Sequence, residues 1–435
     1  MKVNWIKKYI NNAMNKFTDF IFTRFDNVII LINEYSIEKG DIIIEEIRRR
    51  QMTFIEFDVK IDKSKNDVFL TKFLNKLPEN VKSVVISGHN IFNKLGKLPD
   101  SLYSLSYLTD CYYENSDKIR ELTIYYHGKD IIERFSDKLE SLTYFGFIGK
   151  IVNLPENLKE LSLNHQYTCI DSKNNDNVLS DRLVNIMPIG LGKLFFSGNF
   201  IIQRGLSFER FEGMREMRFS YLNIDGRVFE RLPVSLVILE LKSVHTNFLK
   251  LGKLINLRSL SIEEIQVMFE EGDESFSLIF PPFIQTLYYG IIDGRYLRNL
   301  PETLKFLKIN NQVLLNNSCL VTLPMSLERL EYMNGYISVI RDCYEYFPLG
   351  MVLLVIFEDS YDFMEILKKV KSIEGKLEIE LPKHYEDLYR IQMSNGDLLR
   401  PTYDELVKFW TNSRIMQGRY YSGYNMLRLV LNLGN

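Results

Sequence analysis

Residues 154–166 read LPENLKELSLNHQ, and closely related strings return at residues 300–312 (LPETLKFLKINNQ) and 77–90 (LPENVKSVVISGHN). Each string places a proline before a short run with alternating apolar residues, so the chain repeats one structural unit. Thirteen such units divide the 270 residues between the first and last anchor into twelve steps, with a mean of 22.5 residues. A period of this length indicates a solenoid of stacked repeats. The anchor positions are Pro78, Pro99, Ser116, Ser136, Pro155, Pro188, Phe211, Pro233, Leu254, Pro281, Pro301, Pro324 and Pro348.

Apolar residues recur three, six and eight places after each anchor, as in Leu158, Leu161 and Leu163. The last two alternate as in a strand, and so short a strand can bury its inward side chains only against the matching row of the next unit. The proline suits the turn before the strand, because it fixes φ and lacks an N–H donor. The spacing therefore predicts parallel strands of one sheet at residues 81–86, 158–163, 236–241 and 304–309.

The spacing L-x-x-L-x-L over about residues 50–380 resembles the leucine-rich repeat. That resemblance implies an α/β repeat solenoid: a leucine-rich-repeat horseshoe with one curved parallel sheet and irregular or short helical convex segments. The L-P-x-x-L form, as in LPDSL and LPENL, is similar to the repeats of FNIP-type and fungal F-box-associated proteins, and also to bacterial effector repeats. The steps of 17 to 33 residues depart from the tight spacing that is typical of the bacterial repeats.

The two ends of the chain are expected to cover the terminal apolar rows of the solenoid. We assign residues 1–50 to an N-terminal helical cap, residues 51–383 to the solenoid and residues 384–435 to a C-terminal cap. In the last segment, PTYDELVKFWTNSR contains a helix start and YNMLRLVLNLGN alternates like a closing strand. Related fungal proteins carry an F-box at the N-terminus, but its usual leading Leu-Pro is not visible here. A degenerate adaptor-binding module is therefore an alternative for residues 1–50.

Composition and targeting signals favour an intracellular protein, cytoplasmic or nuclear. The net charge is -2, and the four cysteines form no C-x-x-C pair, which fits a reducing compartment. No stretch is long and apolar enough to cross a bilayer, and the basic N-terminus does not resemble a signal peptide. The amphipathic, basic first 25 residues would also suit a mitochondrial presequence, although we favour a packed helix.

No motif predicts catalysis, a cofactor or a metal. The chain has no phosphate-binding glycine loop and no G-x-S-x-G nucleophile elbow. Four histidines fall ten to twelve places after an anchor, where other units carry asparagine, so we interpret them as members of a side-chain ladder that hydrogen-bonds free backbone. These histidines are His89, His127, His165 and His245, and the asparagines are Asn199, Asn223, Asn311 and Asn334.

Side chains five and seven places after the anchor should point outward on the sheet face. Across ten units they include five acidic and four basic residues, which is no basic track for nucleic acid. Aromatic and arginine side chains dominate protein interfaces, so this face is a candidate protein-binding surface, with a merely solvated face as the alternative. We expect Tyr288, Phe306 and Arg329 to contribute most, with the hydroxyl-rich first half acting as a spacer. The candidate binding residues are Phe195, Arg218, Tyr288, Phe306, Lys308, Arg329 and Glu331.

Three functions follow from these observations. The first is a non-catalytic scaffold that binds an unidentified partner protein, without nucleic acid or membrane. The second is a substrate receptor of a cullin-type ubiquitin ligase, with residues 1–50 as a degenerate F-box that binds the ligase adaptor. The third is a bacterial effector-type ubiquitin ligase, which the chain fits least, because only about 50 residues follow residue 384 and none is cysteine.

Overall fold

The structure is a computed structural model in which the chain divides into two compact units, Met1–Met214 (unit 1) and Arg215–Asn435 (unit 2). Each unit is considered by itself. The described residues are 20–22, 27–32, 39–59, 68–69, 72–88, 98–109, 118–126, 132, 135–165, 178–198, 200–267, 277–291, 294–309, 322–333, 348, 352–357, 376–380 and 427–432.

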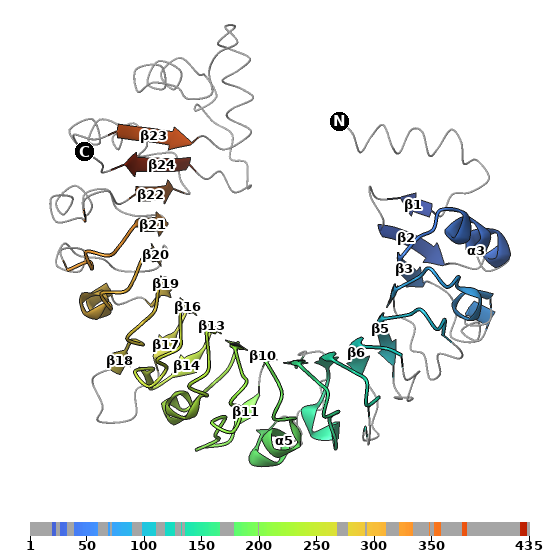
Figure 1. Ribbon diagram of the computed structural model, residues 1–435, viewed down its shortest axis with the longest axis horizontal. Helices are drawn as coiled ribbons and strands as arrows, with labels where there is room; N and C mark the ends of the chain where they lie inside the picture. Colours follow the sequence, from blue (N-terminus) through green and yellow to red (C-terminus); the bar gives the residue numbers. More distant parts are fainter. Residues whose placement is uncertain are drawn as a thin grey trace, which may run out of the picture. The chain divides into compact units, whose positions relative to one another are not determined.

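Unit 1 is built on a sheet whose neighbouring strands are mostly parallel. From β2 each strand pairs in parallel with the next through β8, and β8 pairs with β10, whereas β1 joins β2 antiparallel. Figure 1 shows α3 and α5 in the connecting segments rather than in the strand row. The sheet strands are β1 (Phe20–Phe22), β2 (Asn27–Ile32), β3 (Phe54–Val59), β4 (Ser83–Gly88), β5 (Ser104–Thr109), β6 (Glu121–Tyr126), β7 (Ser141–Phe145), β8 (Glu160–Asn164) and β10 (Lys193–Ser197). The connections contain α3 (Gly40–Arg49), the 3-10 helices η2 (Leu74–Lys76) and η3 (Ile148–Lys150), α5 (Asp181–Ile186), and the parallel pair β9 (Val178–Leu179) and β11 (Ile201–Ile202).

Unit 2 repeats this plan. Its main strands pair in parallel in the order β12, β13, β16, β19, β20, β21 and β22, after which β24 pairs antiparallel with both β22 and β23. The main strands are β12 (Glu216–Ser220), β13 (Ile238–Lys242), β16 (Ser259–Glu263), β19 (Thr286–Gly290), β20 (Phe306–Ile309), β21 (Arg329–Met333), β22 (Val352–Phe357), β23 (Lys376–Glu380) and β24 (Leu427–Asn432). The connections contain the 3-10 helices η4 (Gly226–Arg231) and η5 (Gly294–Asn299), and the parallel pairs β14 (His245–Thr246) with β17 (Gln266–Val267) and β15 (Phe248–Lys250) with β18 (Ser277–Ile279).

These pairings confirm the predicted α/β repeat solenoid. In unit 1, residues 81–86 and 158–163 overlap β4 and β8, which belong to one run of parallel strands. In unit 2, residues 236–241 and 304–309 overlap β13 and β20, which are linked by parallel pairing through β16 and β19. One strand per repeat therefore adds to the sheet, as the period predicts.

The core consists of the residues three, six and eight places after each anchor. In β8 and the turn before it, Leu158, Leu161 and Leu163 are all buried, and Leu161 lies in register with Leu142 and Leu194. The intervening residues of the same strands are mostly half-buried, which leaves the other sheet face open to solvent. The alternation of the sequence thus separates a buried face from an accessible one.

The turn before each strand explains the anchor. The anchor carbonyl accepts the N–H of the residue three places later, as from Leu158 to Pro155 (3.2 Å). Anchors that are not proline make the same bond, since Leu139 donates to Ser136, Met214 to Phe211 and Leu257 to Leu254. These sites lack the sequence signal of proline but keep the turn.

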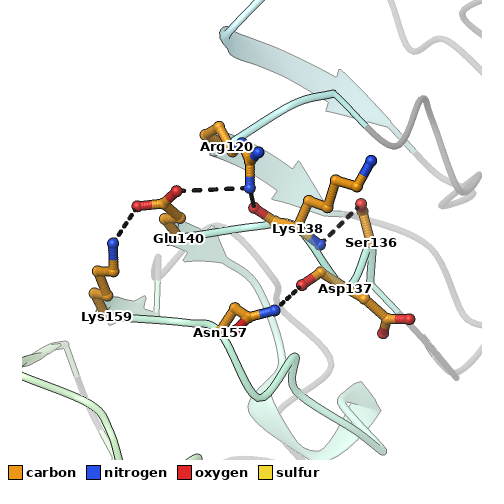
Figure 2. Close-up of polar contacts among 7 residues, drawn as sticks. All are labelled: Arg120, Ser136, Asp137, Lys138, Glu140, Asn157 and Lys159. Carbon is orange, nitrogen blue, oxygen red and sulfur yellow. Dashed lines mark hydrogen bonds and ion pairs between the residues drawn. The ribbon is translucent and has the colours of Figure 1, made fainter.

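The third residue of L-P-x-x-L makes a ladder between units that the sequence analysis did not identify. Asn157 donates its side-chain N–H to the carbonyl of Asp137 in the preceding turn at 2.8 Å (Figure 2). Asn, Ser or Thr occupies this place in other units and donates likewise to a carbonyl near the preceding turn. The further donors are Asn80, Ser101, Asn256, Thr303 and Ser326.

Loss of one ladder bond should have a measurable cost. Ser326 donates its hydroxyl proton to the Leu304 carbonyl at 2.7 Å in a half-buried setting. We expect Ser326→Ala to lower the free energy of unfolding by about 1 kcal/mol, measured by urea denaturation. The matched control is Met325→Ala, because the Met325 side chain is exposed. An equal loss in both variants would assign the effect to the turn rather than to the hydrogen bond.

The predicted domain limits are only partly within the described residues. The parallel sheet already includes β2, inside the segment that the sequence assigns to the N-terminal cap. The helices expected in residues 1–19 and 401–414 lie outside the described residues, while YNMLRLVLNLGN contains β24. The limits at residues 50 and 383 stay predictions. Among the helices that the structure describes, none is long and apolar enough to cross a membrane.

Candidate functional site

Five of the seven predicted binding residues lie on three neighbouring strands of unit 2. Phe306 is paired in register with Arg329, and Tyr288 is in register with Lys308, which is in register with Glu331. The five residues therefore form two adjacent rows on the accessible face of β19, β20 and β21. We call Tyr288, Phe306, Lys308, Arg329 and Glu331 the β19–β21 cluster.

The Arg329 guanidinium is held in place from two sides. It donates from Nη2 and Nε to Oε1 of Glu331 at 2.6 and 3.0 Å, and its Cζ lies 5.9 Å from the ring centroid of Phe306. The ion pair joins positions five and seven of one strand, which point to the same face. Arg329 is consequently ordered while its side chain is still about half exposed (48%).

Lys308 completes the cluster. Its Nζ lies 5.0 Å from the ring centroid of Tyr288 and 3.7 Å from Oε2 of Glu331. Glu331 was expected to point outward, yet it is 9% exposed, because Arg329 and Lys308 cover both of its carboxylate oxygens. A carboxylate so enclosed is a fixed acceptor that orients two cations.

Burial and neighbouring carboxylates raise the pKa of Tyr288. Burial contributes most, followed by the negative charges of Glu263 and Glu331. The phenol is therefore neutral at physiological pH, and its hydroxyl keeps its capacity to donate a hydrogen bond. The cluster thus presents one neutral hydroxyl ring and one plain aromatic ring beside two cations.

Arg218 lies on β12 of the same unit and forms a different group. Its guanidinium donates to Oε1 of Glu216 at 2.5 and 2.8 Å, and its Nε is 3.2 Å from Oε2 of Glu240. Burial raises the pKa of Glu240, Arg218 lowers it, and the charges of Glu216 and Glu263 raise it. Since β13 and β16 separate β12 from β19 in the sheet, Arg218 is not part of the β19–β21 cluster.

Phe195 belongs to unit 1. It lies on β10 in register with Ser162 of β8 and is half-buried on the accessible face. It is therefore considered with the face of unit 1 and not with the cluster.

Two further aromatic residues on the accessible face of unit 1 were missed. The rings of Tyr125 and Phe145 are stacked, with centroids 4.3 Å apart and an interplanar angle of 7°. They stand nine places after their anchors, one alternation beyond the positions five and seven that were considered. The signal was present in the sequence, because the strand pattern continues to that place.

The histidines give no sign of a metal site in the described part of the chain. No three His, Cys, Asp or Glu side chains among the described residues are placed to hold a metal ion. The His165 ring packs near Phe147 and Phe200, at 5.7 and 6.1 Å between centroids, and burial lowers its pKa. Asn223 is exposed, and its backbone forms a bridge with His245. His89, His127, Asn199, Asn311 and Asn334 lie outside the described residues.

Comparison with known proteins adds the fold class alone. No protein-family profile and no curated protein matches the chain. Solved structures do match, among them one described as that of CroV588, "a novel circular LRR protein structure", with 14% sequence identity and a TM-score of 0.32. The match covers 73% of this chain, and the chain spans 58% of the length of that neighbour. The chain is thus similar to a leucine-rich-repeat protein at a level that informs neither partner nor activity.

Proposed function

We propose that this chain is a non-catalytic, intracellular scaffold that binds a partner protein on the sheet face of unit 2, with the β19–β21 cluster as the centre of the interface. The observation that supports this function most is the side-by-side placement of two aromatic rings, an arginine and a lysine on one accessible face. Tyrosine and arginine are enriched among the residues that dominate protein interfaces.

The contacts within the cluster favour binding in a second way. An arginine loses rotamer freedom when a partner immobilises it, at a cost of about 0.5–1.5 kcal/mol per side chain. In this face Glu331 and Phe306 already hold Arg329, so less of that cost falls on association. The exposed part of its guanidinium can then accept a carboxylate or a backbone carbonyl from the partner.

The competing proposal comes from the resemblance to FNIP-type and F-box-associated repeats. In it, residues 1–50 bind a ubiquitin-ligase adaptor, and the chain is a substrate receptor whose solenoid holds the substrate. The effector-type ligase is a third and weaker reading of the same resemblance. These proposals differ from the first in which segment makes the main contact.

A double variant tests the proposal. We expect Phe306→Ala with Arg329→Glu to reduce recovery of the main partner at least tenfold in affinity purification with quantitative mass spectrometry, because it removes the ring and reverses the charge at the centre of the interface. The matched control is Phe283→Ala with Arg258→Glu. Arg258 also lies 5.9 Å from a phenylalanine ring, but this pair is at the turns before the strands.

Deletion of residues 1–50 serves as the third arm. Undiminished partner recovery by the folded double variant, together with loss on deletion, would overturn the cluster proposal in favour of an N-terminal contact. Recovery of ligase adaptors that depends on residues 1–50 would support the substrate-receptor function. Circular dichroism checks that each variant keeps its fold.

A further inference from the structure

The accessible face of unit 1 has a different charge from that of unit 2. From β3 to β10, its charged residues are Glu56, Asp58, Glu121, Glu160 and Lys193, which is four acids and one base. The corresponding positions from β12 to β21 carry four acids and four bases: Glu216, Glu240, Glu263, Glu331, Arg218, Lys242, Lys308 and Arg329. The negative excess is therefore confined to unit 1 among the described strands.

The single lysine of this face does not offset the excess. Lys193 Nζ lies 3.3 Å from Oε2 of Glu160, so its charge is paired with one acid. Glu121 is exposed, and Glu56 accepts a hydrogen bond from the Ser87 hydroxyl at 3.2 Å. A surface of this composition attracts cations and repels phosphate.

The aromatic pair lies on the same face and adds an independent feature. Tyr125 and Glu121 are on one strand, four residues apart, so their side chains point to the same side. The half-buried stack of Tyr125 and Phe145 presents ring faces, which attract lysine and arginine. A side chain that reaches the carboxylates and the rings together must be both long and cationic.

A row of hydroxyls runs between the acids and the rings. Thr123 is in register with Ser106 on one side and with Thr143 on the other, and Thr143 is in register with Ser162. Hydroxyls donate and accept, so this row can bond the backbone of an extended peptide. The face thus provides for the backbone of a segment as well as for its basic side chains.

We propose that the face of β3–β10 in unit 1 is a second binding surface, which takes a lysine- or arginine-rich segment of a partner protein. Its basic side chains lie over Tyr125 and Phe145 and pair with Glu121 and its neighbours. This surface is distinct from the β19–β21 cluster and stands whether or not that cluster binds a partner. It replaces the expectation that the first half of the solenoid is only a spacer.

The test is fluorescence anisotropy of the full chain with a short labelled peptide of alternating lysine and serine. We expect binding that Tyr125→Ala with Glu121→Gln weakens about five- to tenfold, from the loss of a cation–π contact and an ion pair. The control Glu156→Gln removes the same charge from an exposed turn of unit 1 and should leave the affinity unchanged. The unit 2 double variant should also bind the peptide normally, which separates this proposal from the first.

Three outcomes would overturn the inference. One is equal affinity for the wild type and the Tyr125/Glu121 variant, and another is an equal loss in Glu156→Gln, which would indicate diffuse attraction to the whole chain. The third is a concentration-dependent dimer in analytical ultracentrifugation that the Tyr125/Glu121 variant dissolves, because that result assigns the face to a second copy. Binding of the matching aspartate–serine peptide with similar affinity would contradict the charge argument in the same way.

Discussion

Gly198→Ala should lower the free energy of unfolding by about 3 kcal/mol or more in denaturant melts. Gly198 has a φ of +115°, a region that side chains with a Cβ rarely adopt. A Cβ at this position would lie 2.3 Å from the carbonyl oxygen of His165 in the preceding unit. That oxygen belongs to the backbone and cannot move away as the end of a flexible side chain could, so the repeat-to-repeat spacing itself would have to change.

Gly190→Ala is the matched control for Gly198→Ala. Gly190 lies in the turn before the same strand, and a Cβ there would meet nothing within 4 Å. We expect its effect to be within about 0.5 kcal/mol, as for other surface substitutions. If the two alanine variants melt alike, the close approach of Gly198 to His165 is wrong.

The second large effect is expected at the centre of the core. Leu161→Ala should cost about 2–5 kcal/mol, because Leu161 is fully buried between Leu142 and Leu194 and the fixed strand spacing prevents the cavity from closing. The same measurement on Ser162→Ala should show almost no change. Ser162 lies on the accessible face and accepts a hydrogen bond from the side chain of Asn164. Comparable losses at both positions would mean that the two faces have been interchanged.

The sequence predicts the core and the strand direction because both depend on local spacing. Leucines six and eight places after the anchor must share a face in any extended strand, so Leu161 and Leu163 could be assigned without knowing their partners. The ladder of Asn and Ser side chains was missed because its acceptors are carbonyls about 20 residues earlier, as between Asn157 and Asp137. Nothing in the pattern of a single repeat indicates that contact.

Two other features depend on neighbours that the repeat pattern does not identify. Glu331 and Glu216 were expected to be solvated, but an arginine on the same strand covers each of them. The residues after the strands adopt positive φ at Tyr221, Ser243 and Glu264, where the sequence has no glycine to announce a bend. The chain accepts this strain because the backbone there is held by hydrogen bonds to the next strand, as from Ser243 N–H to the Glu263 carbonyl (2.8 Å).

The unbroken register of the strands has a consequence for how such a protein can evolve. In every repeat, one set of positions faces the core and another set, offset by one residue, faces solvent, so a mutation in the second set leaves the packing of the first intact. Residues in one row are placed on a grid whose step is one strand, about 4.8 Å. Selection can therefore move a charge or a ring across the surface one step at a time, and a lineage can exchange one partner for another without passing through an unfolded ancestor.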